Sequence, residues 1–570
     1  MDTKTHLADL LTGALTAAVA DGSLALTATP AIELERPRDA AHGDWACPVA
    51  LRLAKEAKRA PRDIAQIIVD HLPQDDAIAA TEIAGPGFIN VTLSTAALAR
   101  VLVEAHTART DFGRGEPKGE YVQIEFISAN PVGPMHVGHG RWAALGDSLA
   151  LVMEHAGYEI QREFLLNDEG NQMNIFADSV AERYLELLSQ PFDEGAIGYK
   201  GAYIKDIAQQ IIDAEGASWV NKPADERRAY FRERSYEQVL NNTKAICDRF
   251  GVHFDEWFSE HQLHVPDAQG KTPIEHSIDE LREKGYIFDE EGAVWFKSTL
   301  FGDEKDRVLI KKDGVATYFA ADVAYHDNKF KRGFDRVINI WGADHHGYIP
   351  RMMAVVAAIG YPDKLEILLG QLVTLMRGGQ PVRMSKRTGE MVTFEELMDE
   401  VGVDAARYHL VRISSDQQLI FDIEVAKDQS ANNPLYYVQY AHARICSVLR
   451  KAAGLAADEA ADIDAVTAGL IADTPPDFTL LSDESEIALM RKLASFSETV
   501  ERSARDRAPF RLAHYAEELA AIVHQFYGRC PMLVPDDPAL TAARLYEADA
   551  ARWALKTVLA LIGVSAPTKM

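Results

Sequence analysis

Two histidines in a glycine-containing turn are the residues best placed to do chemistry. His136 and His139 stand in the segment ANPVGPMHVGHG, which follows a β-rich run at 121–127 and precedes a helical pattern. Backbone N–H groups and the helix dipole at such a turn favour a phosphate, and Gly138 and Gly140 leave room for a nucleotide. The imidazoles could donate hydrogen bonds to phosphate oxygens during phosphoryl or nucleotidyl transfer. An ordinary turn with two hydrogen-bonded histidines is the alternative.

A basic loop is the second candidate. It follows an expected strand at 372–376 and contains Arg383, Met384, Ser385, Lys386 and Arg387. Three cations and nearby hydroxyls on a loop flanked by glycines can neutralise a polyphosphate leaving group. Basic surface loops are common, so a solvated loop is the alternative.

The order of elements predicts a multidomain α/β protein. Strand, glycine turn, helix and strand follow one another from residue 121, which is typical of a parallel sheet with right-handed crossovers. Residues from about 185 to 300 interrupt this pattern and are interpreted as an insertion, after which runs beginning at 307 and 336 are assigned to the same sheet. We predict an N-terminal α+β domain over 1–112, a Rossmann-like catalytic domain with this insertion over 113–426, and an all-helical C-terminal bundle over 427–570.

Composition excludes several classes of protein. The 570 residues are 47% hydrophobic and 25% charged, which excludes global disorder and low-complexity chains. The formal charge of −27 means that a nucleic acid or an anionic membrane must be held by local basic patches. Four dispersed cysteines provide no zinc or disulfide pattern. The N-terminus does not resemble a signal peptide, and no run approaches the ~18 apolar residues of a membrane helix. We therefore expect a cytoplasmic protein with no membrane partner.

Together these motifs resemble a known enzyme family. HVGH and RMSKR are similar to the HIGH and KMSKS signatures of class I aminoacyl-tRNA synthetases. The blocks GPGFIN, EFISANPVGPMHVGHGR, LNDEGNQ, GVDAARY and NPLYYVQYAHARI are similar to those of arginyl-tRNA synthetases. The resemblance implies ATP-dependent ligation of L-arginine to tRNA(Arg) through an arginyl-adenylate, with transfer to the 2′-hydroxyl of the terminal adenosine. It further implies that adenylate formation needs bound tRNA, that Mg²⁺ enters with ATP as substrate, and that the enzyme is a monomer without a tightly bound cofactor or dedicated metal site.

The resemblance also assigns roles to individual residues. A guanidinium is a planar set of donors, so its site should hold carboxylates. The expected arginine-binding residues are Glu125, Ser128, Asn130, Tyr318 and Asp322, of which the last two lie four apart on an expected helix. The expected ATP-binding residues are His136, Gly138, His139, Arg383, Met384, Ser385 and Lys386. His136, His139 and Lys386 are the expected catalytic residues; Asp344, His345 and His346 are expected at the border of the site. Cap, turn and surface roles are the alternatives for Ser128, Asn130 and Asp322.

The sequence departs from the second signature in two places. Arg383 and Arg387 stand where the signature has lysine and serine, so a point charge is replaced by a two-pronged cation at the first position. For this reason Lys386 is preferred to Arg383 as the catalytic cation. No hydrolytic motif is visible in the insertion, and no editing domain is expected, because a site built around buried carboxylates can itself reject analogues by ~10⁴-fold.

Two regions are expected to contact tRNA. Arg52, Lys55 and Arg59 recur at helical spacing and form a basic stripe near the N-terminus. In the C-terminal segment, Tyr437, Gln439 and Arg444 could stack on or hydrogen-bond to unstacked bases. A solvated helix face and a role in the core are the respective alternatives.

Three rival functions are considered. The closest is another class I synthetase, such as one for cysteine or glutamine; a cysteine-specific enzyme would want a zinc-ligand set that the dispersed cysteines do not supply. A small-molecule nucleotidylyltransferase with the same turn would not need the helical C-terminal third. A synthetase-like RNA-binding protein without activity would not need to retain His136, His139 and Lys386.

Overall fold

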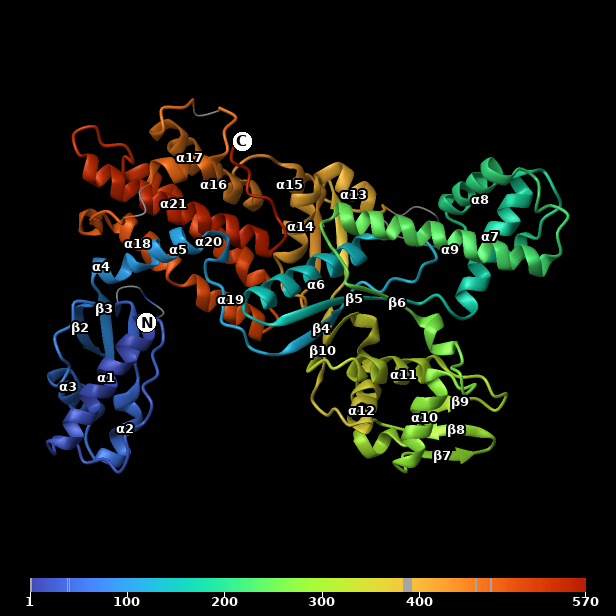
Figure 1. The fold of residues 1–570 in the computed structure, drawn as a ribbon, viewed down its shortest axis with the longest axis horizontal. Coiled ribbons are helices and arrows are strands. Elements are labelled where there is room, and N and C mark those ends of the chain that lie inside the picture. Colours follow the sequence, from blue (N-terminus) through green and yellow to red (C-terminus); the bar gives the residue numbers. More distant parts are fainter. Residues whose placement is uncertain (1–2, 38, 40–41, 383–391, 457–458, 472–473) are drawn as a thin grey trace.

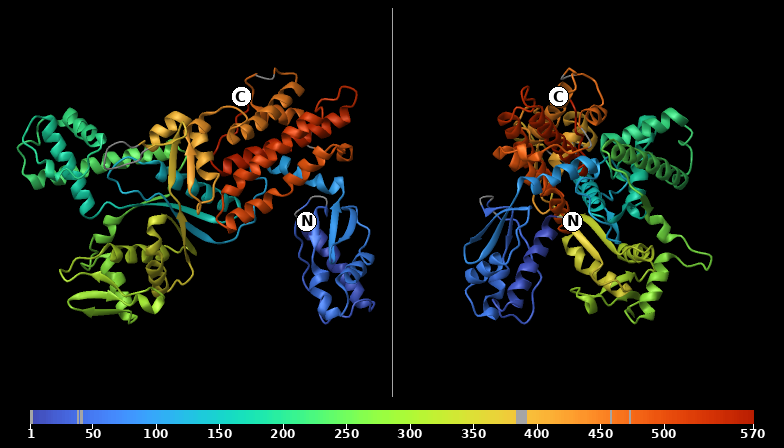
Figure 2. Two further views of the ribbon diagram at one scale, coloured as in Figure 1. Left: turned by 180° about the vertical axis from the view of Figure 1, so that it is seen from behind. Right: turned by 60° about the vertical axis from the view of Figure 1, so that its left-hand side comes forward.

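The computed structural model describes residues 3–37, 39, 42–382, 392–456, 459–471 and 474–570 (Figure 1). A central parallel sheet and a C-terminal helical bundle form an elongated body. The N-terminal domain and a small antiparallel sheet domain extend from the same side of that body (Figure 2).

The N-terminal domain packs three helices on a three-stranded antiparallel sheet of order β1-β3-β2. Its elements are α1 (Thr3–Ala20), β1 (Trp45–Cys47), α2 (Val49–Ala57), α3 (Pro61–Asp70), β2 (Ile78–Ala84) and β3 (Phe88–Leu93). Helix α1 buries one stripe of apolar residues at a spacing of three to four, which includes Leu7, Leu11, Leu15 and Ala18. Pro61 occupies the first turn of α3, where its missing N–H costs nothing.

A five-stranded parallel sheet of order β11-β10-β4-β5-β6 forms the centre of the molecule. The strands are β4 (Tyr121–Glu125), β5 (Glu159–Leu166), β6 (Glu256–Ser259), β10 (Arg336–Gly342) and β11 (Leu365–Gly370). Helices α6 (Val137–His155), α11 (Tyr318–Lys331) and α12 (Ile349–Ile359) are the main helices around it. The crossover from β4 through α6 to β5 confirms the predicted βαβ unit, and the buried run of β4 is typical of a strand covered on both faces.

The insertion differs from the prediction in the placement of two strands, β6 (Glu256–Ser259) and β9 (Arg307–Ile310). Strand β6 lies within 185–300 but pairs with β5 in the central sheet. Strand β9 (Arg307–Ile310), assigned to the central sheet from sequence, instead pairs with β8 (Ala293–Phe296), which pairs with β7 (Ile287–Glu290). The residues of β9 alternate between buried and half-buried, the pattern of a sheet with one covered face, whereas central parallel strands are covered on both.

Helices account for the rest of the insertion and for the C-terminal region. Helices α7 (Asn171–Leu187), α8 (Ala202–Glu215) and α9 (Ala224–Arg249) pack on one another at one end of the body (Figure 1). The C-terminal bundle contains α16 (Pro434–Ala452), α17 (Ile463–Leu470), α18 (Glu484–Leu493), α19 (Phe496–Arg505), α20 (Phe510–Arg529) and α21 (Pro538–Leu561). The described residues after 427 include no strand, which confirms the predicted helical bundle.

Two further groups of elements connect the domains. Helix α5 (Arg100–Ala108), within the expected N-terminal domain, packs against α21 of the bundle. A small sheet of β12 (Val373–Arg377), β13 (Gln380–Pro381) and β14 (Leu419–Asp422) lies with α13 (Phe394–Val401), α14 (Val403–Val411) and α15 (Ile423–Lys427) between the central sheet and the bundle. Nowhere in the described part of the chain is there a helix that is long and apolar enough to span a membrane.

Candidate active site

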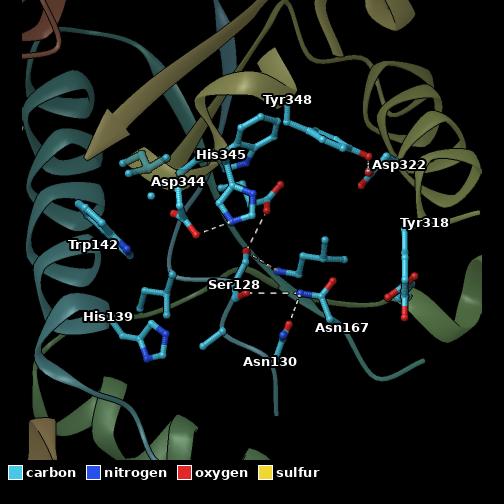
Figure 3. A pocket seen from close by; sticks show the side chains of 18 of the residues that line it. Ser128, Asn130, His139, Trp142, Asn167, Tyr318, Asp322, Asp344, His345 and Tyr348 are labelled. Carbon is cyan, nitrogen blue, oxygen red and sulfur yellow. Dashed lines mark hydrogen bonds and ion pairs between the residues drawn. The ribbon is translucent and has the colours of Figure 1, made fainter. Parts of the chain in front are cut away.

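A cavity of about 880 Å³ opens at the carboxyl ends of β4, β5 and β10. Ligands of open α/β sheets bind at this edge because the loops that follow the strands converge there. The start of α6, one face of α11, the start of β12 and two 3₁₀ helices, η4 (Glu260–His264) and η6 (Ala343–Tyr348), complete the lining. Figure 3 shows Asp322, Tyr348 and Tyr318 at one end and His139 with Trp142, on α6, at the other.

The paired histidines form the N-terminal cap of α6. Each ring accepts the other residue's backbone N–H at its Nδ1 atom, at 3.3 Å, and the rings stack with centroids 3.6 Å apart. A neutral imidazole that accepts at Nδ1 carries its proton on Nε2, so each ring is a donor at its other nitrogen. Both histidines line the cavity. The alternative prediction, a turn in which both histidines are hydrogen-bonded, is therefore confirmed. The same hydrogen bonds leave Nε2 of each ring as the nitrogen that can donate to a ligand.

The two glycines of this turn have different roles. A Cβ on Gly138 would lie 2.9 Å from the His136 ring, so this glycine permits the capped arrangement, and it lines the cavity. A Cβ on Gly140 would lie 2.2 Å from the ring of Phe394 in α13. The expectation that Gly140 makes room for a nucleotide is wrong, because this glycine makes room for helix packing.

Glu125 ends β4 and is held by two donors. Its side chain is almost fully buried and accepts hydrogen bonds from Ser128 Oγ at 2.9 Å and from Lys329 Nζ at 2.5 Å. The chain turns sharply just after the strand, with φ of +69° at Ile127 and +40° at Ser128. Such backbone is costly for residues other than glycine and is retained chiefly at functional sites. It brings Ser128 back to Glu125 and directs the following residues into the cavity.

Asp322 lies four residues after Tyr318 on α11, on the face that lines the cavity. It accepts a hydrogen bond from the hydroxyl of Tyr348. Enclosure in the cavity, together with the nearby charge of Glu125, raises the pKa of Asp322 to about 7 in spite of this hydrogen bond. Glu260 lines the same cavity, and burial with the charges of Asp322 and two other carboxylates raises its pKa to about 7. This end of the cavity is built to receive a cation.

Side-chain amides connect the two ends. Asn130 donates to Gln172 at 2.9 Å and accepts from Asn167 at 3.0 Å (Figure 3). All three residues line the cavity, and these hydrogen bonds fix the positions of their side chains. They offer neutral donors and acceptors for the polar backbone of an amino acid.

The structure brings most of the expected residues together. Glu125, Ser128, Asn130, His136, Gly138, His139, Tyr318 and Asp322 all line the one cavity. Asp344 and His345 also line it, whereas His346 does not. Arg383, Met384, Ser385, Lys386 and Arg387 lie outside the described residues. Among the residues that are described, no group of three or more histidine, cysteine or acidic side chains is arranged to hold a metal ion.

Several lining or supporting residues were not selected from sequence. Asn167 and Gln172 belong to the block LNDEGNQ, and the resemblance of this block to arginyl-tRNA synthetases could have identified them. Lys329 lies seven residues after Asp322, on the same face of α11, and helical spacing could have identified it. Glu260 and Tyr348 come from short 3₁₀ helices whose sequences carry no such period.

The structure also changes the predicted members of the two tRNA-binding regions. Arg52 and Lys55 are exposed on α2, but Arg59 lies beyond the end of this helix, after Lys58 in left-handed conformation, so the stripe does not continue to it. Gln439 is buried in α16 and donates to Asp404 and to Ser565, which makes it a packing residue and not an exposed base contact.

Tyr437 and Arg444 remain accessible on α16. Both side chains are half-buried, and the Arg444 guanidinium lies 3.8 Å from the ring centroid of Tyr527 in α20. Tyr437 packs beside His524 of the same helix, with centroids 4.6 Å apart. Aromatic rings and an arginine at one surface suit stacking on bases.

Comparisons with known proteins agree along the whole chain. The family described as Arginyl tRNA synthetase N terminal domain matches residues 5–93, tRNA synthetases class I (R), catalytic domain matches 102–434, and DALR anticodon binding domain matches 438–570. The chain is 45% identical to an arginine–tRNA ligase of Desulfitobacterium hafniense over 99% of this chain and 98% of that protein. It is 44% identical to one of Moorella thermoacetica over 100% and 99%. The arginyl-tRNA synthetase of Thermus thermophilus has the same fold, with a TM-score of 0.74 at 23% identity and full coverage of both chains.

Proposed function

This chain belongs to the arginyl-tRNA synthetase family and attaches arginine to tRNA for protein synthesis, and we propose that its cavity is where an arginyl-adenylate forms. One observation carries the assignment of the cavity. Glu125 and Asp322, two carboxylates suited to a guanidinium, share one cavity with the paired imidazoles of His136 and His139.

Arginine binds with its guanidinium at the acidic end of the cavity. Asp322 balances its charge, Glu125 accepts hydrogen bonds from it, and Tyr318 stands at the mouth with its side chain largely exposed. Ser128, which is bonded to Glu125, and Asn130, which is bonded to Asn167 and Gln172, hold the polar backbone of the substrate. A neutral analogue would leave buried carboxylates unpaired, which is the strongest available basis for rejection.

ATP binds at the histidine end. The arginine carboxylate attacks the α-phosphorus, the bond to pyrophosphate breaks, and arginyl-adenylate is formed. His136 and His139 donate from Nε2 to phosphate oxygens that gain charge in this step. We assign Lys386, with Arg383, Met384 and Ser385, to the leaving group on the basis of sequence alone. The protein contributes alignment and charge neutralisation and forms no covalent bond with the substrates.

The remaining substrates follow from the same scheme. Mg²⁺ enters on the phosphates of ATP, and Asp344 is an exposed lining carboxylate that suits its coordination shell. The 2′-hydroxyl of the terminal adenosine of the tRNA then attacks the carbonyl of the adenylate and releases AMP. Arg52 and Lys55 of α2, and Tyr437 and Arg444 of α16, are the tRNA contacts that the structure leaves accessible.

Pyrophosphate exchange tests this function directly. The purified full-length chain is incubated with ATP, labelled pyrophosphate and total tRNA, and each of the twenty amino acids is added in turn. Exchange is expected with arginine only. Equal exchange with lysine or glutamine would reject the arginine assignment, and exchange that is unchanged in the Asp322→Asn variant would reject the assignment of the cavity.

A further inference from the structure

Lys329 is a fully buried cation that the proposed reaction does not use. Its side chain has no exposed surface, and its Nζ atom donates to Glu125 at 2.5 Å and to Asn339 Oδ1 at 3.1 Å. The ring of Tyr325 covers it, with the centroid 4.4 Å from Nζ. Lysine is seldom buried in this way unless it is paired, because the desolvation of an ammonium is expensive. The pairing with Glu125 must therefore be worth keeping.

A buried network connects this pair to Asp322. Asn339 of β10 lies opposite Glu125 in the parallel register, and its Nδ2 atom is 3.0 Å from Nε2 of His326. The Nδ1 atom of His326 bonds the backbone carbonyl of Asp322 at 2.8 Å. Burial lowers the pKa of His326 to about 3, so this ring is neutral and donates from Nδ1. One set of hydrogen bonds thus joins the Glu125 carboxylate to the backbone of α11 at Asp322, whose own carboxylate is held by Tyr348.

Charge balance gives the network a purpose. The cavity encloses Glu125, Asp322 and Glu260, and like charges in one enclosed site oppose ionisation. Lys329 supplies one compensating charge from behind, at Glu125. The Glu125 carboxylate can then keep its position before arginine binds. The positive charge of the guanidinium is balanced by Asp322 and Glu260.

We propose that Lys329 is a positioning residue for arginine: it holds the Glu125 carboxylate and balances its charge, so that the cavity is organised before the guanidinium arrives. The inference rests on the proposed function, since it takes arginine as the ligand of this cavity. Lys329 does not touch the substrate and acts through Glu125.

Single substitutions of the full chain give the first test. The Lys329→Met variant should bind arginine about tenfold more weakly by calorimetry, because Glu125 loses its partner and its orientation. Its KM for ATP should change less than threefold. Lys329→Arg should recover part of the affinity. Lys331→Met is the matched control, because Lys331 lies two residues away on α11, is half-exposed, pairs with the half-exposed Glu280 and the buried Asp327, and does not line the cavity. Equal losses for arginine and ATP in Lys329→Met would overturn the proposal.

A double variant makes the test sharper. Glu125→Gln should weaken arginine binding about 100-fold, in part because Lys329 becomes an unbalanced cation close to the guanidinium. Removal of that cation in Glu125→Gln/Lys329→Met should restore about tenfold of the loss. A purely structural lysine predicts the reverse order, with the double variant weaker than Glu125→Gln, and that order would overturn the proposal. The comparison also holds if Lys329→Met alone does not fold.

The same measurements separate this proposal from the proposed function. Wild-type protein that binds arginine but shows no arginine-dependent pyrophosphate exchange would reject the function and leave the role of Lys329 to be judged by the order of the variants. Wild-type protein without arginine affinity would overturn both.

Discussion

The two ends of the cavity are organised by different physical means. At the acidic end, Glu125 is buried and held by the side chains of Ser128 and Lys329. The Asp322 carboxylate accepts a hydrogen bond from Tyr348, and its backbone carbonyl accepts one from His326. At the histidine end, His136 and His139 are held by backbone N–H groups in the first turn of α6. The first arrangement depends on Lys329 and Tyr348, which are distant in sequence from the carboxylates that they bind, and the second on residues three apart.

This difference corresponds to the charges that we propose each end binds. A guanidinium keeps its charge throughout the reaction, so the carboxylates that balance it can be fixed in advance inside the protein. The phosphates gain charge as the bond to pyrophosphate breaks, so donors at an accessible helix terminus, joined by cations from a loop, suit them better. The acidic end should therefore govern the affinity for arginine and the histidine end the rate.

Asp322→Asn should produce the largest effect. If it did not, the claim that the acidic end governs the affinity for arginine would be wrong. The KM for arginine is expected to rise by about 10³-fold, because the amide cannot balance the guanidinium and the Tyr348 hydroxyl loses its charged acceptor. The KM for ATP should change less than threefold. Steady-state pyrophosphate exchange measures both constants. Asp313→Asn, in an exposed turn after β9, is the control. Similar changes in both constants would mean that Asp322 does not act on arginine alone.

His136→Asn should have the next largest effect, on the rate. Asparagine is a good helix cap, so α6 should keep its N-terminus, but its amide is shorter than the imidazole and does not bring a donor to where Nε2 of His136 meets the phosphates. The expected fall in kcat is about 10²-fold, with the KM for arginine nearly constant. Thermal unfolding should show little loss of stability. An unchanged kcat would show that this histidine is only a cap.

The sequence predicted local features of both ends better than their surroundings. The βαβ unit, the strand-to-helix turn that contains His136 and His139, and the pair of Tyr318 and Asp322 on one helix depend on short-range spacing, which is visible in the chain. The positions of β6 and β9 depend on which distant strand each one pairs with, and spacing carries no information on this. Polar residues that the fold buries, such as Lys329 and Gln439, look from sequence like surface residues because lysine and glutamine usually are.

The acidic end should also make arginine binding depend on pH. Asp322 and Glu260 both have pKa values raised to about 7, so both carboxyls are largely protonated below this pH. Each must lose its proton before it can balance the charge of the guanidinium. The KM for arginine should therefore fall as pH rises toward 7, by up to about tenfold per pH unit for each carboxyl that must lose a proton, and level off above about 8. The KM for ATP should not follow this profile. Measurements from pH 6 to 9 test it, and a flat profile for arginine would contradict it.

Tyr348→Phe should give the smallest effect and the finest test of the acidic end. The Tyr348 hydroxyl stabilises the ionised form of Asp322, so its removal should raise the pKa of Asp322 further. The pH at which the KM for arginine levels off should move upward by about one unit, while the KM at pH 9 should change only a fewfold, the cost of one hydrogen bond. Tyr361→Phe, beyond the end of α12 and outside the cavity lining, is the matched control. A downward shift would mean that the hydroxyl opposes the ionisation of Asp322, which contradicts the role given to Tyr348.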